Sequence, residues 1–150
     1  MTSKIALCAG AVLAGAGLGQ GLSARADGLD PIAMRQVGMD LAGGSFGFIR
    51  AMVAAKGDVT KLEDPGKALA RWGRTIPVVF PPGTDKGENT KALPVIWSER
   101  ADFEKAASKM ADSATKLAEL AKAGDADGVA AQTKELGEAC GACHRHFRAK

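Results

Sequence analysis

The stretch Gly137–Phe147, GEACGACHRHF, places two cysteines three positions apart and a histidine directly after the second cysteine. An α-helix turns about 100° per residue, so side chains at positions i, i+3 and i+4 share one helical face. Cys140, Cys143 and His144 are therefore expected to project together from one helix. The predicted core-facing stripe of that helix comprises Val129, Gln132, Leu136, Cys140, Cys143 and Phe147.

This cluster has the chemistry of a c-type haem attachment site. Two thiols can add to the two vinyl groups of one porphyrin, and the adjacent imidazole can then reach the iron. Three other interpretations stay open from the motif alone: a thioredoxin-like redox pair, a zinc site, and two core cysteines beside an incidental histidine. A disulfide between Cys140 and Cys143 would close a very small loop and stabilise little.

The composition limits the classes of function. The chain has 150 residues, 46% of them hydrophobic and 25% charged, which suits one globular domain with a real core. Its formal net charge is +3, and Lys4 and Arg25 in the first 26 residues supply two of those charges. The remainder is nearly neutral, whereas nucleic-acid binding needs a concentrated cationic face. The sequence also offers no constellation for catalysis, so we predict neither a nucleic-acid partner nor an enzyme with its own substrate.

Residues 1–26 have the pattern of a secretory signal peptide. Lys4 supplies a positive start, Ile5–Gly19 is uncharged and rich in Ala, Gly and Leu, and Ala24–Ala26 offers a small-x-small cleavage site. An uncleaved anchor is the alternative, but the many glycines fit poorly the roughly 20 apolar residues that a spanning helix needs. We therefore expect export to the periplasm, cleavage without later membrane insertion, and loss of Cys8 with the signal.

The mature segment, residues 27–150, is predicted to fold as one all-α domain. Four amphipathic helices are expected, at about 31–56, 65–76, 94–123 and 127–147. We expect the first to begin at the cap Asp30 and to stop at Gly57, and the fourth to begin at the cap Asp127. Because no convincing strand alternation is present, the pattern predicts an antiparallel four-helix bundle with a covalently bound haem.

Two further helix stripes and one connection complete the expected arrangement. The stripe of the first helix comprises Ile32, Arg35, Gln36, Met39, Gly43, Phe46, Arg50 and Val53. The stripe of the third helix comprises Phe103, Ala106, Met110, Ala114, Leu117 and Ala121. The connection at 77–93 is longer than most helix connections, so we expect it to pack over a functional feature.

With a Cys-Gly-Ala-Cys-His motif at the end of a predicted four-helix bundle, the sequence resembles the cytochrome c′ family of class II c-type cytochromes. The similarity covers essentially all of the mature chain. The supporting positions are Arg35-Gln36, Met39, Phe46-Gly47, Pro77, Phe80, Pro82-Gly83-Thr84, Pro94-x-Ile96-Trp97 and Phe147-Arg148. The terminal motif is specific to haem attachment, and the other positions support it.

The resemblance implies a role for each matching residue. It implies that Cys140 and Cys143 form thioethers to a single haem c and that His144 is the proximal axial ligand of its iron. Arg148 matches a basic residue that often flanks the proximal side. Arg35 matches an arginine near the haem propionates.

Met39 matches the position that faces the other side of the iron. We predict electron transfer through the haem iron, with binding of small gases as the alternative. In low-spin relatives a methionine of the first helix ligates the iron, which gives an electron carrier. In members whose iron stays five-coordinate, this position only blocks the face, and small neutral gases such as nitric oxide or carbon monoxide bind. Met39 can also simply fill core space. Met34 and Met52 are weaker candidates because neither matches the family position.

The surface residues suggest partners. Arg145, Arg148 and Lys150 either steer an acidic redox partner or form a solvated helix end. His146, two residues after His144, is expected at the surface. Homodimers are common in the family, and some apolar residues lie off the haem-facing stripe of the first helix. These residues are Met34, Val37, Leu41 and Phe48. They form either a dimer face or a contact with the second helix inside one subunit.

Overall fold

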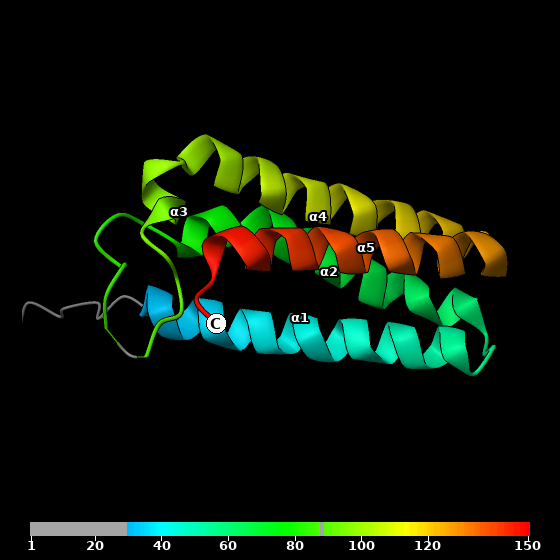
Figure 1. Cartoon of the computed structure of the whole chain (residues 1–150). Coiled ribbons are helices and arrows are strands. Elements are labelled where there is room, and N and C mark those ends of the chain that lie inside the picture. The colour runs from blue at the N-terminus through cyan, green and yellow to red at the C-terminus, as the bar shows by residue number, and fades with distance from the viewer. Residues whose placement is uncertain (1–29, 88) are drawn as a thin grey trace, which may run out of the picture.

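A computed structural model describes residues 30–87 and 89–150, and in it four long helices run alternately up and down (Figure 1). The long helices are α1 Pro31–Ala54, α2 Glu63–Thr75, α4 Arg100–Lys122 and α5 Ala126–Phe147. The short helices are η1 Val59–Leu62, η2 Ile76–Val79 and α3 Val95–Ser98. The predicted all-α antiparallel four-helix bundle is confirmed. The predicted signal segment at 1–26 lies outside the described residues.

The helix α1 begins where the sequence predicted. The Asp30 carboxylate accepts hydrogen bonds from the backbone N–H groups of Ile32 at 2.9 Å and Ala33 at 3.2 Å. These bonds satisfy two of the backbone donors that a helix N-terminus leaves without intrahelical partners. Pro31 has no backbone N–H, so it adds no further unpaired donor. The first helix is therefore capped as expected.

The end and the buried face of α1 differ in detail from the prediction. The helix ends at Ala54, and the left-handed residue that follows is Lys56, with φ 51°, rather than the predicted stop Gly57. The predicted stripe included Arg50, which is exposed, whereas its neighbour Ile49 is fully buried. The helical period of 3.6 residues does not decide between adjacent positions at the edge of a stripe. Here the apolar Ile49, and not the charged Arg50, occupies the core position.

The predicted third helix is broken in two. Glu99 has φ −114° and ψ 47°, which ends α3 and starts α4. The break lets the Arg100 guanidinium donate to the carbonyl oxygens of Pro77 at 2.7 Å and Phe80 at 2.8 Å. These hydrogen bonds join residues that are distant in the sequence. Helical periodicity describes only neighbouring turns, so it did not predict the break.

The cap of α5 is Asp125 and not the predicted Asp127. The Asp125 carboxylate accepts a hydrogen bond of 2.9 Å from the backbone N–H of Gly128. Gly124, with φ +71°, makes the left-handed turn after α4 and leaves Asp125 in the non-helical conformation that a cap requires. Asp127 lies within the first turn, where a carboxylate also favours the positive helix end.

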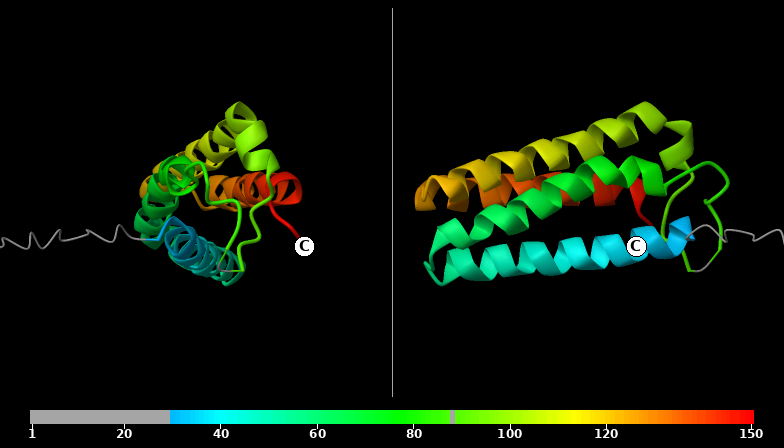
Figure 2. Two further views of the ribbon diagram at one scale, coloured as in Figure 1. Left: turned by 90° about the vertical axis from the view of Figure 1, so that its left-hand side faces the viewer. Right: turned by 180° about the vertical axis from the view of Figure 1, so that it is seen from behind.

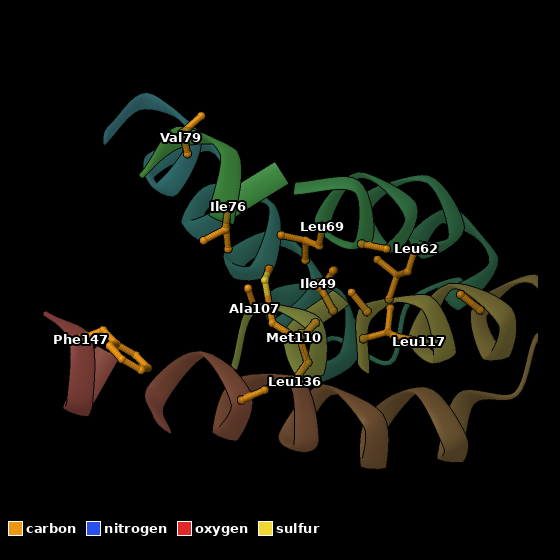
Figure 3. Packing of buried hydrophobic residues seen from close by; sticks show 14 of the residues in the cluster. Ile49, Leu62, Leu69, Ile76, Val79, Ala107, Met110, Leu117, Leu136 and Phe147 are labelled. Carbon is orange, nitrogen blue, oxygen red and sulfur yellow. The ribbon is translucent and has the colours of Figure 1, made fainter. Parts of the chain in front are cut away.

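The buried core fills the bundle along its length, and α1, α2, α4 and α5 surround it in chain order (Figures 2 and 3). The most deeply buried large side chains are Phe103, Ile49, Leu62, Ile96, Leu117, Leu136 and Val129. The helices α2 and α4 approach closely, because a Cβ added to Gly66 would lie 3.0 Å from the Cβ of Ala118. No helix of the described ranges combines the length and the apolar character needed to cross a membrane.

Candidate functional site

The cysteine and histidine cluster of α5 opens onto two adjoining cavities. The outer cavity, about 530 Å³, is lined by Arg35, Met39, Phe80, Thr90, His144 and Arg148 among others. The inner cavity, about 170 Å³, is lined by Met39, Phe46, Trp72, Met110, Cys140 and His144 among others. Cys143 and Gly43 line both cavities. The predicted cluster is therefore brought together beside a space of the size typical of cofactor sites.

Both thiols of this cluster are unbridged and partly buried. Burial raises the pKa of both thiols, and for Cys143, to which Cys140 adds a smaller effect, the pKa reaches about 11. A thioredoxin-like nucleophile requires the opposite shift toward the thiolate. Within residues 30–87 and 89–150 no group of three or more His, Cys, Asp or Glu side chains is placed to hold a metal, so nothing there supports a closed zinc site.

The two histidines of α5 have different environments. Burial lowers the pKa of His144, and the nearby positive charge of Arg148 lowers it further. The imidazole of His144 is thus favoured in its neutral form, which is the form that ligates metals. His146 is exposed, and its Nε2 lies 2.8 Å from Oε2 of Glu99. His146 therefore faces the surface, as predicted, while His144 faces the cavities.

Arg35 is a buried cation with neutral partners. Its side chain is 3% exposed, and its guanidinium donates to Thr84 Oγ1 at 2.9 Å, to the Thr84 carbonyl at 2.7 Å and to Thr90 Oγ1 at 2.6 Å. The guanidinium also lies over the ring of Phe80, 4.5 Å from its centroid. Burial lowers the pKa of Arg35, and Asp30 opposes that effect. No salt bridge of the described residues includes Arg35, and its side chain lines the outer cavity.

The long connection covers the outer cavity, as its length led us to expect. Thr90, Lys91 and Ala92 line that cavity, and Ala92 forms an isolated antiparallel bridge with Arg148. The backbone N–H of Leu93 donates to the Phe147 carbonyl at 3.0 Å, and the N–H of Ala149 donates to the Lys91 carbonyl at 2.8 Å. The bridge holds Arg148 at the cavity, one turn beyond His144.

Of the three methionines considered from the sequence, only Met39 lies at the site. Met39 lines both cavities together with His144 and packs against the hydrophobic core. Met34 is 39% exposed, and Met52 lies against Gly57 at the other end of α1. The structure therefore supports Met39 as the residue facing the site, with its thioether available either for ligation or for packing.

Trp72 is a site residue that the sequence reasoning missed. Its side chain lines the inner cavity, and its Nε1 is buried without a hydrogen-bond acceptor among the described residues. It packs against the backbone of Gly38 in α1, where an added Cβ would overlap the indole ring. The available signal was composition, because the chain has only two tryptophans. No spacing motif connects Trp72 to the cysteines.

The donor set fits a c-type haem. Two unbridged thiols and a neutral imidazole occupy one helical face, and they open onto cavities with a buried cation at one end and mostly apolar walls at the other. A haem has the same division, with two carboxylates on one edge of an otherwise apolar ring. The buried charge of Arg35 is also a feature that a bound anionic group can satisfy.

Comparison with known proteins supports this assignment. The family model for cytochrome c′ matches residues 30–148. The chain is 37% identical over 123 residues to cytochrome c′ of Rubrivivax gelatinosus, covering 81% of this chain and 95% of that protein. It is similar to a solved cytochrome c′ with ligand-controlled dimer dissociation, with TM-score 0.76, 30% identity, and coverage of 82% and 99% of the two chains. It is also similar to a nitric oxide complex of a mutant cytochrome c′ of Alcaligenes xylosoxidans, with TM-score 0.73, 30% identity, and coverage of 81% and 94%.

Proposed function

Because the chain belongs to the cytochrome c′ family, whose members bind one covalently attached haem c, we propose that it binds small neutral gases such as nitric oxide or carbon monoxide. The observation that carries the proposal is the inner cavity, which lies between Met39 and His144 and has mostly apolar walls. Such walls disfavour anions and water but admit neutral diatomic molecules. This is a binding function and not the turnover of a separate substrate.

The proposal gives each site residue a task. Cys140 and Cys143 would hold the haem through thioethers, and His144 would ligate its iron. Arg148 would lie beside the haem, and the guanidinium of Arg35 would attract its propionates. When bound, the haem supplies an iron that takes a diatomic ligand and exchanges electrons. The relative from Alcaligenes xylosoxidans that forms a nitric oxide complex supports the choice of ligand.

Electron transfer is the second candidate, and the placement of Met39 favours it. Its thioether shares both cavities with His144, and a thioether ligand stabilises ferrous iron and raises the reduction potential. The exposed cations Arg145 and Arg148 lie on the same end of the bundle and would steer an acidic redox partner. In this alternative the sixth position of the iron is closed by Met39.

Visible absorption spectra separate the two functions. We expect the purified oxidised and reduced haem protein to show high-spin bands that shift when carbon monoxide is added. Sharp low-spin bands with a sulfur-to-iron charge-transfer band and no response to carbon monoxide would instead establish the electron carrier. Met39→Leu should then convert that low-spin spectrum to high-spin, whereas Met34→Leu, on the exposed side of the same helix, should leave it unchanged.

We also propose that the protein is exported to the periplasm and that residues 1–26 are removed. The support is the sequence pattern of a positive residue, an apolar stretch and a small-x-small site. Thioether attachment also suits an exported protein, because a covalently held haem is not lost by dissociation. Mass measurement of the protein purified from the periplasmic fraction should give a chain that starts near Asp27, whereas an intact N-terminus would overturn the cleavage.

A homodimer through α1 follows from its exposed apolar residues. These residues and their exposed fractions are Met34 39%, Val37 58%, Leu41 70% and Phe48 47%. Their spacing of three, four and seven places them in one stripe that stays exposed in the single subunit. The ligand-controlled dimer of a similar cytochrome c′ supports the proposal. Sedimentation should show a dimer that Leu41→Lys converts to a monomer, and a monomeric wild type would contradict it.

A further inference from the structure

A groove between α2 and α4, here called the α2–α4 groove, lies apart from the haem site. It has a volume of about 290 Å³ and shares no lining residue with the two cavities beside His144. Ala70 of α2 and Ala118 of α4 are buried and form its floor. The two backbones are close at this floor, because a Cβ added to Gly66 would lie 3.0 Å from the Cβ of Ala118. Longer side chains on either side of the floor therefore form the walls.

Basic side chains dominate the walls of the α2–α4 groove. Lys67, Arg71 and Arg74 follow one another at steps of four and three, so they share one face of α2. They are also all the basic residues of that helix. Lys122 lines the groove from α4. Four cations from two helices therefore surround one concave surface of a chain whose residues 27–150 are nearly neutral overall.

Two carboxylates also line the groove, but they leave most of its positive charge without an ion pair. Oε1 of Glu63 lies 2.6 Å from Nζ of Lys67, and Glu119 is the second acid. Within the part of the chain that the structure describes, no salt bridge includes Lys122 or either arginine of α2. The groove thus keeps an excess of cations that the protein itself does not pair.

The charged groups of the two helices lie close enough to influence one another across the groove. The hydrogen bond from Lys67 lowers the pKa of Glu63, and the positive charge of Lys122 in α4 lowers it further. Glu63 in turn raises the pKa of Lys67, while the positive charge of Arg71 opposes that rise. Like charges one turn apart on a helix repel each other, and a bound anion would relieve this repulsion.

We propose that the α2–α4 groove binds a small polyanion with two or more oxyanion groups, such as a diphosphate. Guanidinium groups form paired hydrogen bonds with the oxygens of phosphate and carboxylate groups, and Arg71 and Arg74 supply two guanidinium groups one turn apart. An anion with several charged groups can engage cations of both helices at once, whereas a single chloride cannot. This site is independent of the haem and of the proposed gas binding.

The test is isothermal titration calorimetry of the purified haem protein with inorganic pyrophosphate, at a constant ionic strength of about 0.15 M. We expect Arg71→Gln and Arg74→Gln each to weaken binding about 5- to 10-fold, because each removes a charge-assisted partner of the anion. Glu119→Gln should tighten binding, because it removes a carboxylate that repels the anion. Arg50→Gln is the matched control, since it removes an exposed arginine of α1 that does not line the groove, and its affinity should equal that of the wild type.

Two outcomes would overturn the proposal. If Arg50→Gln weakens binding as much as Arg71→Gln, pyrophosphate senses only the overall charge of the protein and the groove is not its site. If the wild type does not bind pyrophosphate at this ionic strength, the groove is not a polyanion site at all. Carbon monoxide binding, measured in the same samples, tests the gas-binding function separately.

A second arm identifies the source of the oxyanion groups. The wild type and Arg71→Gln are sedimented with vesicles of phosphatidylglycerol and phosphatidylcholine. Vesicle binding that Arg71→Gln reduces would assign the groove to a lipid headgroup. Pyrophosphate binding without vesicle binding, which we expect for a groove between two packed helices, would assign it to a soluble compound.

Discussion

In α2, Gly73 faces α4 so closely that an added Cβ would lie 2.8 Å from the Cβ of Ala111, whereas in α1 neither Gly43 nor Gly47 has a contacting atom from elsewhere in the chain within 4 Å. The same residue thus serves opposite purposes in the two helices. In α2 it allows two backbones to approach closely, and in α1 Gly43, which lines both cavities, leaves space beside them. The bundle has one half closed by small residues and one half held open for a large group.

The comparison implies that the two halves depend differently on the haem. The helices α2 and α4 both contribute to the buried core, including Leu69 of α2 and Leu117 of α4 (Figure 3). Residues of α1 and α5 line both cavities, and residues of α2 and α4 complete the walls, so much of the surface facing the cavities is buried only when they are filled. Four predictions test this division, in order of decreasing expected effect.

Replacing both Cys140 and Cys143 by alanine should have the largest effect. We expect complete loss of covalently held haem, measured by haem staining of the denatured chain. In the haem-free protein, amide hydrogen exchange should speed up in α1 and in the C-terminal part of α5 while α2 and α4 keep their protection. Equal loss of protection in all four helices would refute the division into two halves.

The closed half should reject a larger side chain at Gly73. Gly73→Leu must push α2 from α4 and is expected to reduce the free energy of unfolding by about 3 kcal/mol. Gly47→Ala is the matched control in α1, and it should stabilise by about 0.5–1 kcal/mol because alanine is the better helix former and has open space there. Denaturant unfolding of the haem proteins measures both changes. Equal changes in the free energy of unfolding would contradict the difference between α1 and α2.

Arg35 should be the most important polar anchor of the open half. Arg35→Met removes the donors that hold Thr84 and Thr90, so it should destabilise the haem protein by about 2 kcal/mol and expose the connection at 81–92 to proteases. Arg50→Met, at an exposed position of the same helix, should change stability by less than about 0.5 kcal/mol. If both variants resist proteolysis equally, the connection has another anchor.

The smallest effect concerns Asp58, which caps η1 far from the cavities. Hydrogen bonds from the hydroxyl and the backbone of Thr60 hold the pKa of Asp58 below its ordinary value. A carboxylate with a depressed folded pKa stabilises the protein above its unfolded pKa, and the contribution disappears as the pH falls through the folded pKa. Asp58→Asn should therefore slightly lower the unfolding midpoint in urea at pH 6 and have little effect at pH 3. A difference as large at pH 3 would exclude this carboxylate as the cause.

The sequence predicted those features that depend on local spacing. Helical period brought Cys140, Cys143 and His144 to one face, and the cap at Asp30 marked the first helix correctly. Such rules act within one or two turns. The number and direction of the helices followed from the same signals. Met39 was identified differently, because the resemblance to the cytochrome c′ family pointed to its position, and the structure places it at both cavities.

Features that depend on contacts between distant segments did not follow from spacing. The break at Glu99 accompanies the bonds of Arg100 to the connection before α3, and those bonds join residues 20 and 23 positions apart. The packing of Trp72 in α2 depends on Gly38 in α1, because a Cβ at that position would overlap the indole ring. Two aspartates near the start of α5 looked alike in sequence, and only the turn at Gly124 placed Asp125 at the cap.

The pairing of Lys91–Leu93 with Phe147–Ala149 has a consequence for the order of events during synthesis. The first segment emerges from the ribosome long before the second, and no hydrogen bond of this bridge can form until the second has followed. The wall over the outer cavity is therefore fixed only once the end of α5, which carries Cys140, Cys143 and His144, has docked against the connection.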